Sequence, residues 1–459
     1  MAGLNDRISY YSTNLKAPEV TFREALLKGL APDGGLYMPS SIPVVSGSFL
    51  ESLRSKTYPG VASEVMGILL QDEIEKIDLA DLCYEAYNFS VPIERIGDNS
   101  YIMRLDQGPT SSFKDFAALM MGRLMQHFLK NDNKHLTILT ATSGDTGGAV
   151  ASAFHGLGNI KVIILFPEKE VTPIQRKQMT TLHGNVKAIA IRGKFDDCQS
   201  MVKKAFMDKS LVPLNLSSAN SINIGRLLPQ SVYYFWAWSR ITAKSENQMI
   251  FSVPSGNLGN LAGGLIAREM GLPVKRMVIS TNSNNEVPEY LRTGIYNPIS
   301  PSINNISSAM NVGHPSNLAR IIAFYGGQMD ESGSFSKLPD LGKMRRDFYA
   351  TSVSDNDTAE AIRICSRKYG IMLEPHGAVA WFGLKQFLKE FPDANDHNLF
   401  RVAIETAHPG KFREEVEKIL GSTLALPDSL AKAEAGKEEY ISLENNFEEF
   451  RNYMINKFN

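Results

Sequence analysis

Short apolar runs alternate with glycine-rich turns and helical segments from about residue 99 onward. The runs are rich in β-branched residues and comprise Leu136–Leu139, Val162–Phe166, Val186–Ile191, Met249–Val253, Met277–Ser280 and Val402–Ile404. Such runs are typical of strands buried on both faces of a parallel sheet. Helices are predicted between them over Gly147–Phe154 and Met201–Phe206. The alternation predicts α/β layers with a mostly parallel sheet in each half of the chain.

A chain of 459 residues is too long for one ordinary hydrophobic core, so several domains are expected. The first part is rich in turn residues, as in Ala31–Pro39, and then becomes acidic and helical near Leu69–Tyr87. A polar stretch at Ala243–Gln248 follows an aromatic helix and marks a second boundary. We therefore predict an N-terminal domain over residues 1–95 and two α/β domains over residues 96–245 and 246–459.

Apolar residues recur at helical spacing near the end of the chain. They are Leu443, Phe447, Phe450, Met454 and Phe458. This spacing predicts an amphipathic helix that packs its apolar face on the body of the protein.

Composition narrows the class of protein. Hydrophobic residues make up 43% and charged residues 21%, as in a globular enzyme. The 48 basic and 49 acidic residues leave a net charge of −1, so neither nucleic acid nor an anionic membrane is an expected partner. No apolar run approaches the roughly 20 residues that span a bilayer. The first residues lack a signal-peptide pattern and the three cysteines are far apart, which together predict a reducing, cytoplasmic location.

One lysine has an unusual setting in the segment Gly108–Asp115, which runs Gly-Pro-Thr-Ser-Ser-Phe-Lys-Asp. Lys114 follows Phe113 and precedes the apolar run Phe116–Met121, so we expect its surroundings to be buried. A lysine in apolar surroundings has a lowered pKa, and its neutral amine can form a Schiff base or transfer protons. The open alternative for any one lysine is a solvated surface charge.

A compact glycine loop, Ser255–Asn260, follows the predicted strand Met249–Val253. Gly256 and Gly259 can adopt positive φ and let backbone amides approach an anion closely. The next residues are expected to begin a helix whose N-terminus favours a phosphate. A tight turn without a ligand remains the alternative. The loop matches neither a Walker loop nor Gly-x-Gly-x-x-Gly, so a nucleotide site is not indicated.

Pyridoxal phosphate is the common cofactor that needs a lysine amine and an anion loop together. Two more polar turns, Thr142–Gly148 and Glu405–Pro409, also follow predicted strands. In open parallel sheets, ligands lie beyond the carboxyl ends of the strands. We therefore predict that these two turns and the glycine loop converge on one cleft.

Two segments offer groups for an anionic substrate. Ser143–Gly147 combines hydroxyls, a carboxylate and glycines at a predicted helix start, which also fits an ordinary helix cap. Asn220–Arg226 clusters amides with Arg226, whose guanidinium can hold a carboxylate or phosphate through two hydrogen bonds. A surface salt bridge is the open alternative for Arg226.

Other common kinds of site find no support. None of the eight histidines has metal-ligand spacing, and the cysteines form no metal motif, so no metal is predicted. The hydrolase motif Gly-x-Ser-x-Gly is absent. For His408 we expect a structural hydrogen bond.

These motifs together resemble the threonine synthase family of pyridoxal-phosphate enzymes. The resemblance runs in order through Tyr11–Thr13, Gly29–Tyr37, Gly108–Asp115, Ala141–Ala149, Phe195–Gln199, Asn220–Arg226, Ser255–Asn260 and Thr406–Pro409. It therefore covers nearly the whole chain. It implies fold type II, that is, two three-layer α/β/α domains with mostly parallel sheets, preceded by an N-terminal segment typical of the family.

The resemblance also implies roles for individual residues. Lys114 would be the catalytic lysine that carries pyridoxal 5′-phosphate, and Thr406 would lie against the pyridine nitrogen. The cofactor phosphate would be bound by Gly256, Asn257, Leu258, Gly259 and Asn260. The substrate would be contacted by Ser143, Asp145, Thr146, Asn220, Asn223 and Arg226. A hydroxyl at the pyridine nitrogen is not expected to keep that nitrogen protonated, which would favour elimination and replacement over transamination.

The implied activity is that of a lyase acting in threonine biosynthesis. It would convert O-phospho-L-homoserine and water to L-threonine and phosphate by elimination and β-addition. A monomer is favoured because the chain resembles the longer branch of the family. Two alternatives remain open here: a serine/threonine dehydratase of the same fold, and a catalytically silent binding protein.

Overall fold

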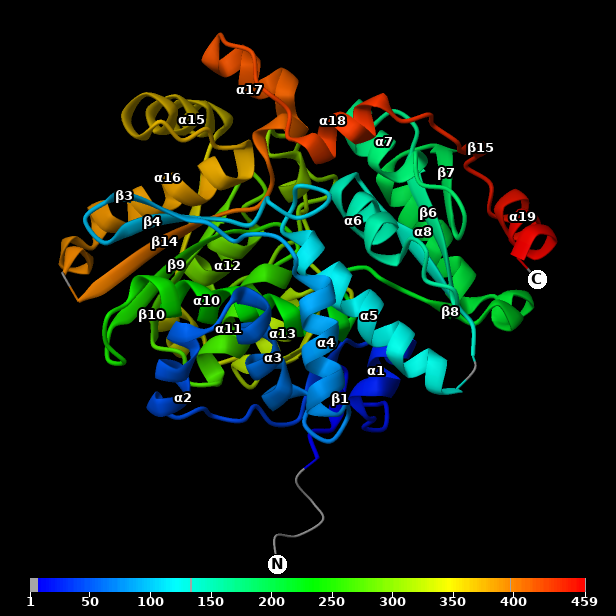
Figure 1. Cartoon of the computed structure of the whole chain (residues 1–459), viewed down its shortest axis with the longest axis horizontal. Coiled ribbons are helices and arrows are strands. Elements are labelled where there is room, and N and C mark those ends of the chain that lie inside the picture. The colour runs from blue at the N-terminus through cyan, green and yellow to red at the C-terminus, as the bar shows by residue number, and fades with distance from the viewer. Residues whose placement is uncertain (1–6, 133, 397, 459) are drawn as a thin grey trace, which may run out of the picture.

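A computed structural model describes residues 7–132, 134–396 and 398–458. Two sheets organise the chain, and Figure 1 shows them on opposite sides of the molecule, with β9 and β14 in one and β6 and β7 in the other. Helices lie on both faces of each sheet. The expected α/β class with three layers is therefore confirmed.

The larger sheet has six strands in the order β13-β10-β9-β14-β4-β3. Their bounds are β3 (Ile93–Gly97), β4 (Ser100–Arg104), β9 (Gln248–Pro254), β10 (Val274–Thr281), β13 (Phe348–Ser352) and β14 (Leu399–Glu405). All neighbours pair in parallel except β3 with β4. The central strands are almost completely buried, as their continuous apolar sequences predict.

The smaller sheet has five strands, all paired in parallel, in the order β15-β7-β6-β5-β8. Their bounds are β5 (Leu136–Ala141), β6 (Ile160–Pro167), β7 (Val186–Arg192), β8 (Leu216–Ser217) and β15 (Ile441–Glu444). Each of the six strands predicted from apolar runs falls within a strand of one of the two sheets.

Two groups of helices cover the outer faces of the sheets. On the larger sheet these are α15 (Asp355–Tyr369), α16 (Pro375–Glu390) and α17 (Arg413–Leu420), and on the smaller sheet α8 (Phe195–Met207) and α19 (Phe447–Phe458). The main hydrophobic core lies between the sheets and includes residues of α1 (Phe22–Lys28), α3 (Tyr58–Leu69), α4 (Lys76–Ala86), α5 (Lys114–Asp132), α6 (Asp145–Phe154), α10 (Val232–Ile241) and α11 (Gly259–Glu269). The two sheets are thereby joined through one continuous core.

The remaining elements are short or peripheral. The helices are α2 (Gly47–Ser52), α7 (Pro173–Thr180), α9 (Ile224–Leu227), α12 (Glu286–Thr293), α13 (Leu318–Phe324), α14 (Leu341–Asp347) and α18 (Asp428–Ala435). Two small antiparallel sheets pair β1 (Tyr10–Ser12) with β2 (Tyr37–Pro39) and β11 (Gln328–Met329) with β12 (Phe335–Lys337).

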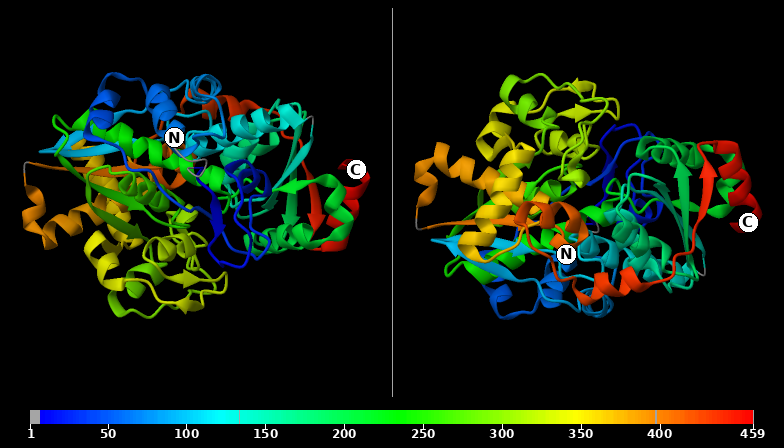
Figure 2. Two further views of the ribbon diagram at one scale, coloured as in Figure 1. Left: turned by 90° about the horizontal axis from the view of Figure 1, so that it is seen from below. Right: turned by 90° about the horizontal axis from the view of Figure 1, so that it is seen from above.

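The sheets are built from interleaved parts of the chain. β3 and β4 precede the smaller sheet in sequence but belong to the larger one. Conversely, the chain leaves the larger sheet after β14, and α18 leads to β15 and α19 beside the smaller sheet (Figure 2, right). The division at residues 95 and 245 stays a prediction, since strand membership follows space rather than sequence order.

The predicted C-terminal helix is present, with one correction. Phe447, Phe450, Met454 and Phe458 lie in α19, and Phe450 and Met454 are fully buried. Leu443 lies instead in β15, which pairs with β7. A single apolar residue fits a helical and a strand period equally well, so the spacing did not separate them.

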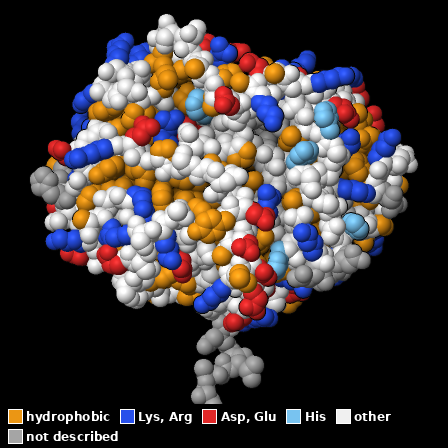
Figure 3. Space-filling view, in the orientation of Figure 1, with side chains coloured by type: hydrophobic (Ala, Val, Ile, Leu, Met, Phe, Trp, Pro, Cys, Tyr) orange, Lys and Arg blue, Asp and Glu red, His pale blue; other side chains and the backbone are white. Residues whose placement is uncertain are grey.

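The surface shows no single-sign field on the face in Figure 3, where basic and acidic side chains are interspersed. Among the described residues, no helix has the length and apolar character that crossing a bilayer requires.

Candidate active site

Lys114 is the first residue of α5 and follows a loop held by its own neighbours. Its N–H donates to Ser112 Oγ at 3.2 Å, and Ser112 pairs across an isolated bridge with Ala407. The side chain is 17% exposed, and Nζ lies 3.5 Å from Asp145 Oδ2 and 4.8 Å from the centre of the Phe113 ring. The Lys114 side chain is therefore mostly buried, as expected from the apolar residues around it.

Asp115 fixes the loop that precedes this lysine. Its carboxylate accepts hydrogen bonds from Thr110 N at 2.8 Å and Thr110 Oγ1 at 2.5 Å. Burial raises the pKa of Asp115 to about 6 despite these hydrogen bonds. Gly108 completes the loop because a Cβ there would lie 2.5 Å from Asp115 Oδ2.

Asp145, at the start of α6, connects two lysines. Its Oδ1 lies 2.8 Å from Nζ of Lys411, whose side chain is fully buried, while its Oδ2 faces Lys114. Gln175 Nε2 also donates to Oδ1 at 3.0 Å. Burial opposes the ionisation of Asp145, but Lys411 and Lys114 outweigh it and hold the pKa of this carboxyl well below its usual range.

Lys411 is the functional candidate that the sequence did not reveal. It lies in the short turn after β14, and its Nζ also donates to Thr110 O at 3.0 Å. Thr406 and His408 in the same turn stand out in the sequence, whereas Lys411 does not. The predicted structural bond of His408 is confirmed, because Gly410 N donates to its Nδ1 at 3.0 Å.

The electrostatic surroundings lower the pKa of the Lys114 amine. Burial lowers the pKa of Lys114; Asp145 acts against burial, whereas the positive charges of Lys411 and Arg226 lower it further. A lysine with a lowered pKa is a nucleophile and a base near neutral pH. Lys114 therefore presents a reactive amine beside the ionised carboxylate of Asp145.

Arg226, in α9, is 3% exposed and carries unused hydrogen-bonding capacity. Its Nη1 donates to Ala219 O at 2.7 Å, and its buried Nε has no hydrogen-bond partner in the described part of the chain. Burial lowers its pKa to about 10, so the guanidinium stays charged at neutral pH. A buried cation with a free donor is suited to binding an anion.

The other predicted substrate residues differ in their exposure and in how many of their hydrogen-bonding groups are used within the protein. Ser143 is exposed and Thr146 is half-buried. Asn220 donates to Ala141 O at 3.2 Å, and its buried Oδ1 has no hydrogen-bond partner among the described residues. Asn223 is fully committed within the protein, because its amide donates to Leu26 O and Ser218 O and accepts from Gly225 N.

The glycine loop connects β9 to α11, as predicted. The residue with positive φ is Leu258, at 59°, and neither Gly256 nor Gly259 is among the residues with positive φ. Gly256 is required for a different reason, since a Cβ there would lie 3.0 Å from Met310 Cα and 3.1 Å from Ala309 O. Left-handed backbone at a non-glycine residue is uncommon and occurs often at ligand-binding loops.

The first amides of α11 are available for an anion. No side chain caps this helix, and the first N–H groups of any α-helix lack partners within the helix. Asn257 orients the loop by donating to Ser221 Oγ at 2.6 Å and accepting from Ser316 N at 2.6 Å. Asn260 accepts from the hydroxyls of Tyr233 and Tyr234, both at 2.7 Å.

Thr406 lies directly beside the lysine loop. Its carbonyl accepts from Phe113 N at 2.8 Å, and its Oγ1 donates to Glu374 Oε1 at 3.1 Å. Glu374 in turn contacts His376, whose Nε2 accepts from Ala309 N at 3.0 Å. Ala309 is the residue that packs against Gly256.

These contacts form an open ring around one region. The ring passes from the Lys114 loop through Thr406, Glu374, His376 and Ala309 to the glycine loop, and Asn257 joins that loop to Ser221 in the segment that carries Arg226. The turn after β5 joins through Asp145, although β5 belongs to the smaller sheet. The three polar turns thus lie around a common region between the two sheets.

The residues in this ring fit pyridoxal phosphate. The cofactor needs an amine for its aldehyde and an anion cradle for its phosphate, and Lys114 and the uncapped start of α11 have those properties. The space that a Cβ would fill at Gly256 is already occupied by the backbone of Ala309 and Met310. The loop therefore has no room for a side chain at this position.

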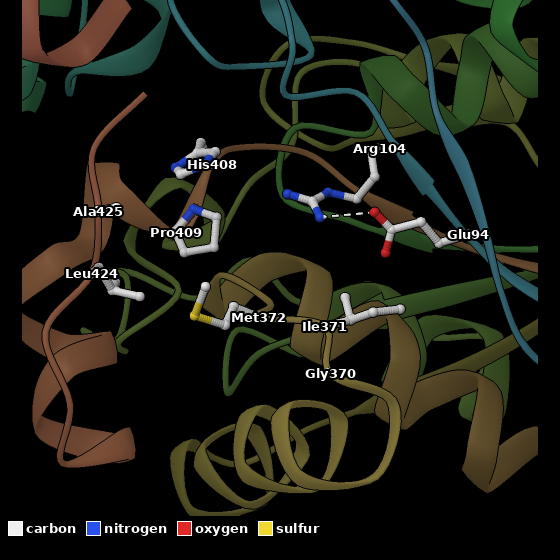
Figure 4. A pocket seen from close by; sticks show the side chains of 9 residues that line it. All are labelled: Glu94, Arg104, Gly370, Ile371, Met372, His408, Pro409, Leu424 and Ala425. Atoms are coloured by element: carbon white, nitrogen blue, oxygen red, sulfur yellow. Dashed lines mark hydrogen bonds and ion pairs between the residues drawn. The ribbon is translucent and has the colours of Figure 1, made fainter. Parts of the chain in front are cut away.

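A separate cavity of about 240 Å³ lies next to the turn that carries Thr406 (Figure 4). Arg104, His408 and Met372 are among its lining residues, and Arg104 pairs there with Glu94 at 3.3 Å. Lys114 and the glycine loop are not among the lining residues, so this cavity is distinct from the ring of contacts described above.

Comparison with known proteins defines the class first. Residues 83–397 match the family described as pyridoxal-phosphate dependent enzyme. The fold and this match together define a pyridoxal-phosphate-dependent enzyme of fold type II. Two flanking matches are more specific, to the threonine synthase N terminus over residues 9–87 and to the threonine synthase C-terminal family over residues 382–454.

Individual relatives agree with these matches. Threonine synthase of Haemophilus influenzae is 39% identical over 445 residues, which cover 96% of this chain and 99% of that protein. The crystal structure of pyridoxal-phosphate-bound threonine synthase from Brucella melitensis has a TM-score of 0.90 at 34% identity and covers 98% of this chain and 99% of its own. The yeast enzyme has a TM-score of 0.89 at 30% identity, with 97% and 98% covered. The chain belongs to the threonine synthase family.

Proposed function

We propose that the protein converts O-phospho-L-homoserine and water to L-threonine and phosphate. The chain is a pyridoxal-phosphate-dependent lyase of this family, and the choice of substrate is our inference. The observation that carries it is the buried, incompletely satisfied Arg226 close enough to Lys114 to lower the pKa of its amine. O-phospho-L-homoserine carries a phosphate besides its carboxylate, and Arg226 supplies a buried cation that can bind one of these two anions.

In this proposal Lys114 holds the cofactor covalently through Nζ. The cofactor phosphate would be held by the start of α11 and the loop before it, and Thr406 would face the ring nitrogen. The residues of this loop and helix start are Gly256, Asn257, Leu258, Gly259 and Asn260. When bound, pyridoxal phosphate supplies an electron sink for the charge that develops on the substrate carbon.

The side chains around Lys114 then carry out binding and proton transfer. Lys114 Nζ would remove the α-proton of the bound substrate, because a lowered pKa favours the amine as a base. Asp145, held ionised by Lys411, accepts a hydrogen bond from the amine and so fixes its position. Arg226 and Asn220 orient the substrate through their unused donor and acceptor, and Ser143 and Thr146 border the same region.

Asn223 and Asn260 already use much of their amide groups within the protein. Both N–H donors of Asn223 and one lone pair of its amide oxygen are used within the protein, so we propose that it supports the substrate by shaping the Ser218–Arg226 turn. Asn260 likewise uses its carbonyl oxygen on two tyrosines, while its buried Nδ2 has no hydrogen-bond partner among the described residues.

A phosphate-release assay tests the proposal. Purified enzyme loaded with pyridoxal phosphate is expected to release one phosphate and form one threonine for each O-phosphohomoserine consumed. Threonine and serine are the comparison substrates, since a dehydratase would release ammonia from them. Ammonia release from threonine without phosphate release from O-phosphohomoserine would contradict the proposal.

The remaining properties of the protein follow the same proposal. We infer that it works in the cytoplasm on a small-molecule substrate, with no nucleic-acid or membrane partner, and that it acts as a monomer. The balanced composition and the interspersed charges on the face in Figure 3 support this inference.

We predict that Gly256→Ala weakens cofactor binding by roughly 10- to 100-fold. The added methyl group would lie 3.0 Å from Met310 Cα, and overpacking of this kind costs about 1–3 kcal/mol. Titration of the apoenzyme with pyridoxal phosphate, followed by absorbance, measures the effect. Gly158→Ala is the matched control because no atom lies within 4 Å of the position of its Cβ. Equal affinities in the two variants would contradict the assigned role of Gly256.

A further inference from the structure

Glu374 is a buried carboxylate that the family resemblance did not bring forward. It precedes α16, a helix of 16 residues, and its side chain caps that helix by accepting from Gly377 N at 2.8 Å and His376 N at 2.6 Å. It is fully buried. The N-terminus of a long helix favours a negative charge, so this position stabilises the ionised form.

Two side chains complete the coordination of Glu374. Oε2 also contacts His376 Nδ1, and Oε1 contacts Thr406 Oγ1 at 3.1 Å. The tautomer of His376 is fixed by its other nitrogen, since Nε2 accepts from Ala309 N at 3.0 Å and so carries no hydrogen. Nδ1 therefore bears the hydrogen and donates it to Glu374.

Four donors around one carboxylate leave no place for a proton. An ionised carboxylate has about four acceptor positions, and Glu374 uses them on two backbone N–H groups, the imidazole and the hydroxyl of Thr406. The neighbouring Glu405 does not compete for this role, since burial raises its pKa well above the usual range and its Oε1 accepts from Glu374 N. Glu374 is the carboxylate that faces Thr406.

It follows that the hydroxyl hydrogen of Thr406 is committed to Glu374. A hydrogen bond to an ionised acceptor is roughly twice as strong as one between neutral groups, so Thr406 donates to Glu374 rather than to a neutral ring nitrogen. Thr406 Oγ1 then offers only lone pairs to a further partner. A group placed against it must be a donor.

We propose that Glu374 acts through Thr406 to hold a proton on the ring nitrogen of the cofactor. The inference rests on the proposed function, which places Thr406 against that nitrogen. Glu374 is a positioning residue, because it orients the hydroxyl and supplies the negative charge without touching the cofactor. Arg104 lies 3.2 Å from Glu405 and 2.6 Å from Asp106, and the carboxylate of Asp106 compensates its charge.

The sequence predicts a neutral ring nitrogen and a weak electron sink, because a threonine alone is a poor partner for a protonated ring. A threonine whose hydrogen is taken by a buried carboxylate is an acceptor backed by a negative charge. Thr406 and Glu374 together place an acceptor oxygen against the ring and a negative charge one residue behind it.

Nitrogen NMR of the holoenzyme tests the inference directly. The enzyme is loaded with pyridoxal phosphate labelled with ¹⁵N in the ring, and the ring resonance is compared with those of free protonated and neutral cofactor. We expect the wild-type resonance at the protonated position. In Glu374→Gln we expect the neutral position, because the new amide donates to Thr406 and releases its hydroxyl hydrogen toward the ring.

Two substitutions at Thr406 keep the test decisive if the Glu374 variant does not fold. Thr406→Val removes the hydroxyl with little change of shape and is expected to give the neutral position, whereas Thr406→Ser is expected to keep the protonated one. A protonated ring in Thr406→Val would overturn the inference, as would a neutral ring in the wild type.

Separate outcomes test the role of Glu374 and the proposed function. A neutral ring in wild-type enzyme whose cofactor is reduced by borohydride onto Lys114 would overturn the role of Glu374 and leave the proposed function standing. Absence of any cofactor attached to Lys114 would overturn both.

Discussion

Lys114→Ala is expected to abolish the visible absorbance of the cofactor-loaded enzyme and to lower turnover by about 1,000-fold or more. The variant lacks the amine that anchors the cofactor and transfers the proton, and proton transfer by a positioned side chain alone contributes roughly 100- to 10,000-fold. The fold should survive, because Asp145 keeps Lys411 at 2.8 Å and Gln175 at 3.0 Å. Absorbance spectra and phosphate release measure the two effects.

Lys130→Ala is the matched control for this experiment. Lys130 lies near the end of the same helix, α5, and is exposed. It should keep both the absorbance and the turnover of the wild type. A Lys114→Ala variant that retained the spectrum and full activity would contradict the assignment of the catalytic amine.

Asp145→Asn is expected to lower the free energy of unfolding by about 3–5 kcal/mol, the usual cost of removing one partner from a buried ion pair. The substitution leaves the positive charge of Lys411 in a fully buried position with only neutral acceptors. Turnover should fall as well, because the amine of Lys114 loses its anionic neighbour. Urea unfolding of the apoenzyme measures the stability change without the cofactor.

Asp98→Asn provides the comparison for the loss of Asp145. The ion pair of Asp98 with Arg95 spans 4.0 Å between side chains that are 99% and 64% exposed. Exposed pairs contribute little, so the change should stay below about 1 kcal/mol. Equal effects of the two substitutions would show that the Asp145 cluster is not the buried charge pair described here.

Much of the fold could be predicted from the sequence for a simple physical reason. Strands buried on both faces must be apolar along their length, and all six runs found in this way lie in the two sheets. The glycine loop was found by the same logic, since it directly follows β9. Local sequence therefore located the elements and the chemistry at their carboxyl ends.

The rest depends on contacts between distant residues. Lys411 has no distinctive neighbours in sequence, and its burial and its pairing with Asp145 come from packing of the turn after β14 against the Thr110 loop. The acceptor character of Thr406 is likewise set by Glu374, 32 residues away. Strand β15 was missed because four residues carry too short a pattern to distinguish it from the helix that follows.

The placement of positive φ illustrates a limit of reasoning from residue type. Glycine tolerates this conformation best, so Gly256 and Gly259 are the residues of this loop that could take it most easily. In the structure Leu258 takes it instead, with its side chain buried, so packing of the leucine offsets the backbone cost. Gly256 is needed for the closeness of Ala309 and Met310 rather than for its dihedral angle.

Borohydride reduction of the cofactor-loaded enzyme, followed by peptide mass spectrometry, addresses the central claim most directly. An amine near one sheet and an amide cradle near the helix after β9 should receive a single ligand between them, so the reduced cofactor should appear on the peptide that contains Lys114. Attachment at Lys411 or at a surface lysine, or no attachment at all, would contradict the account.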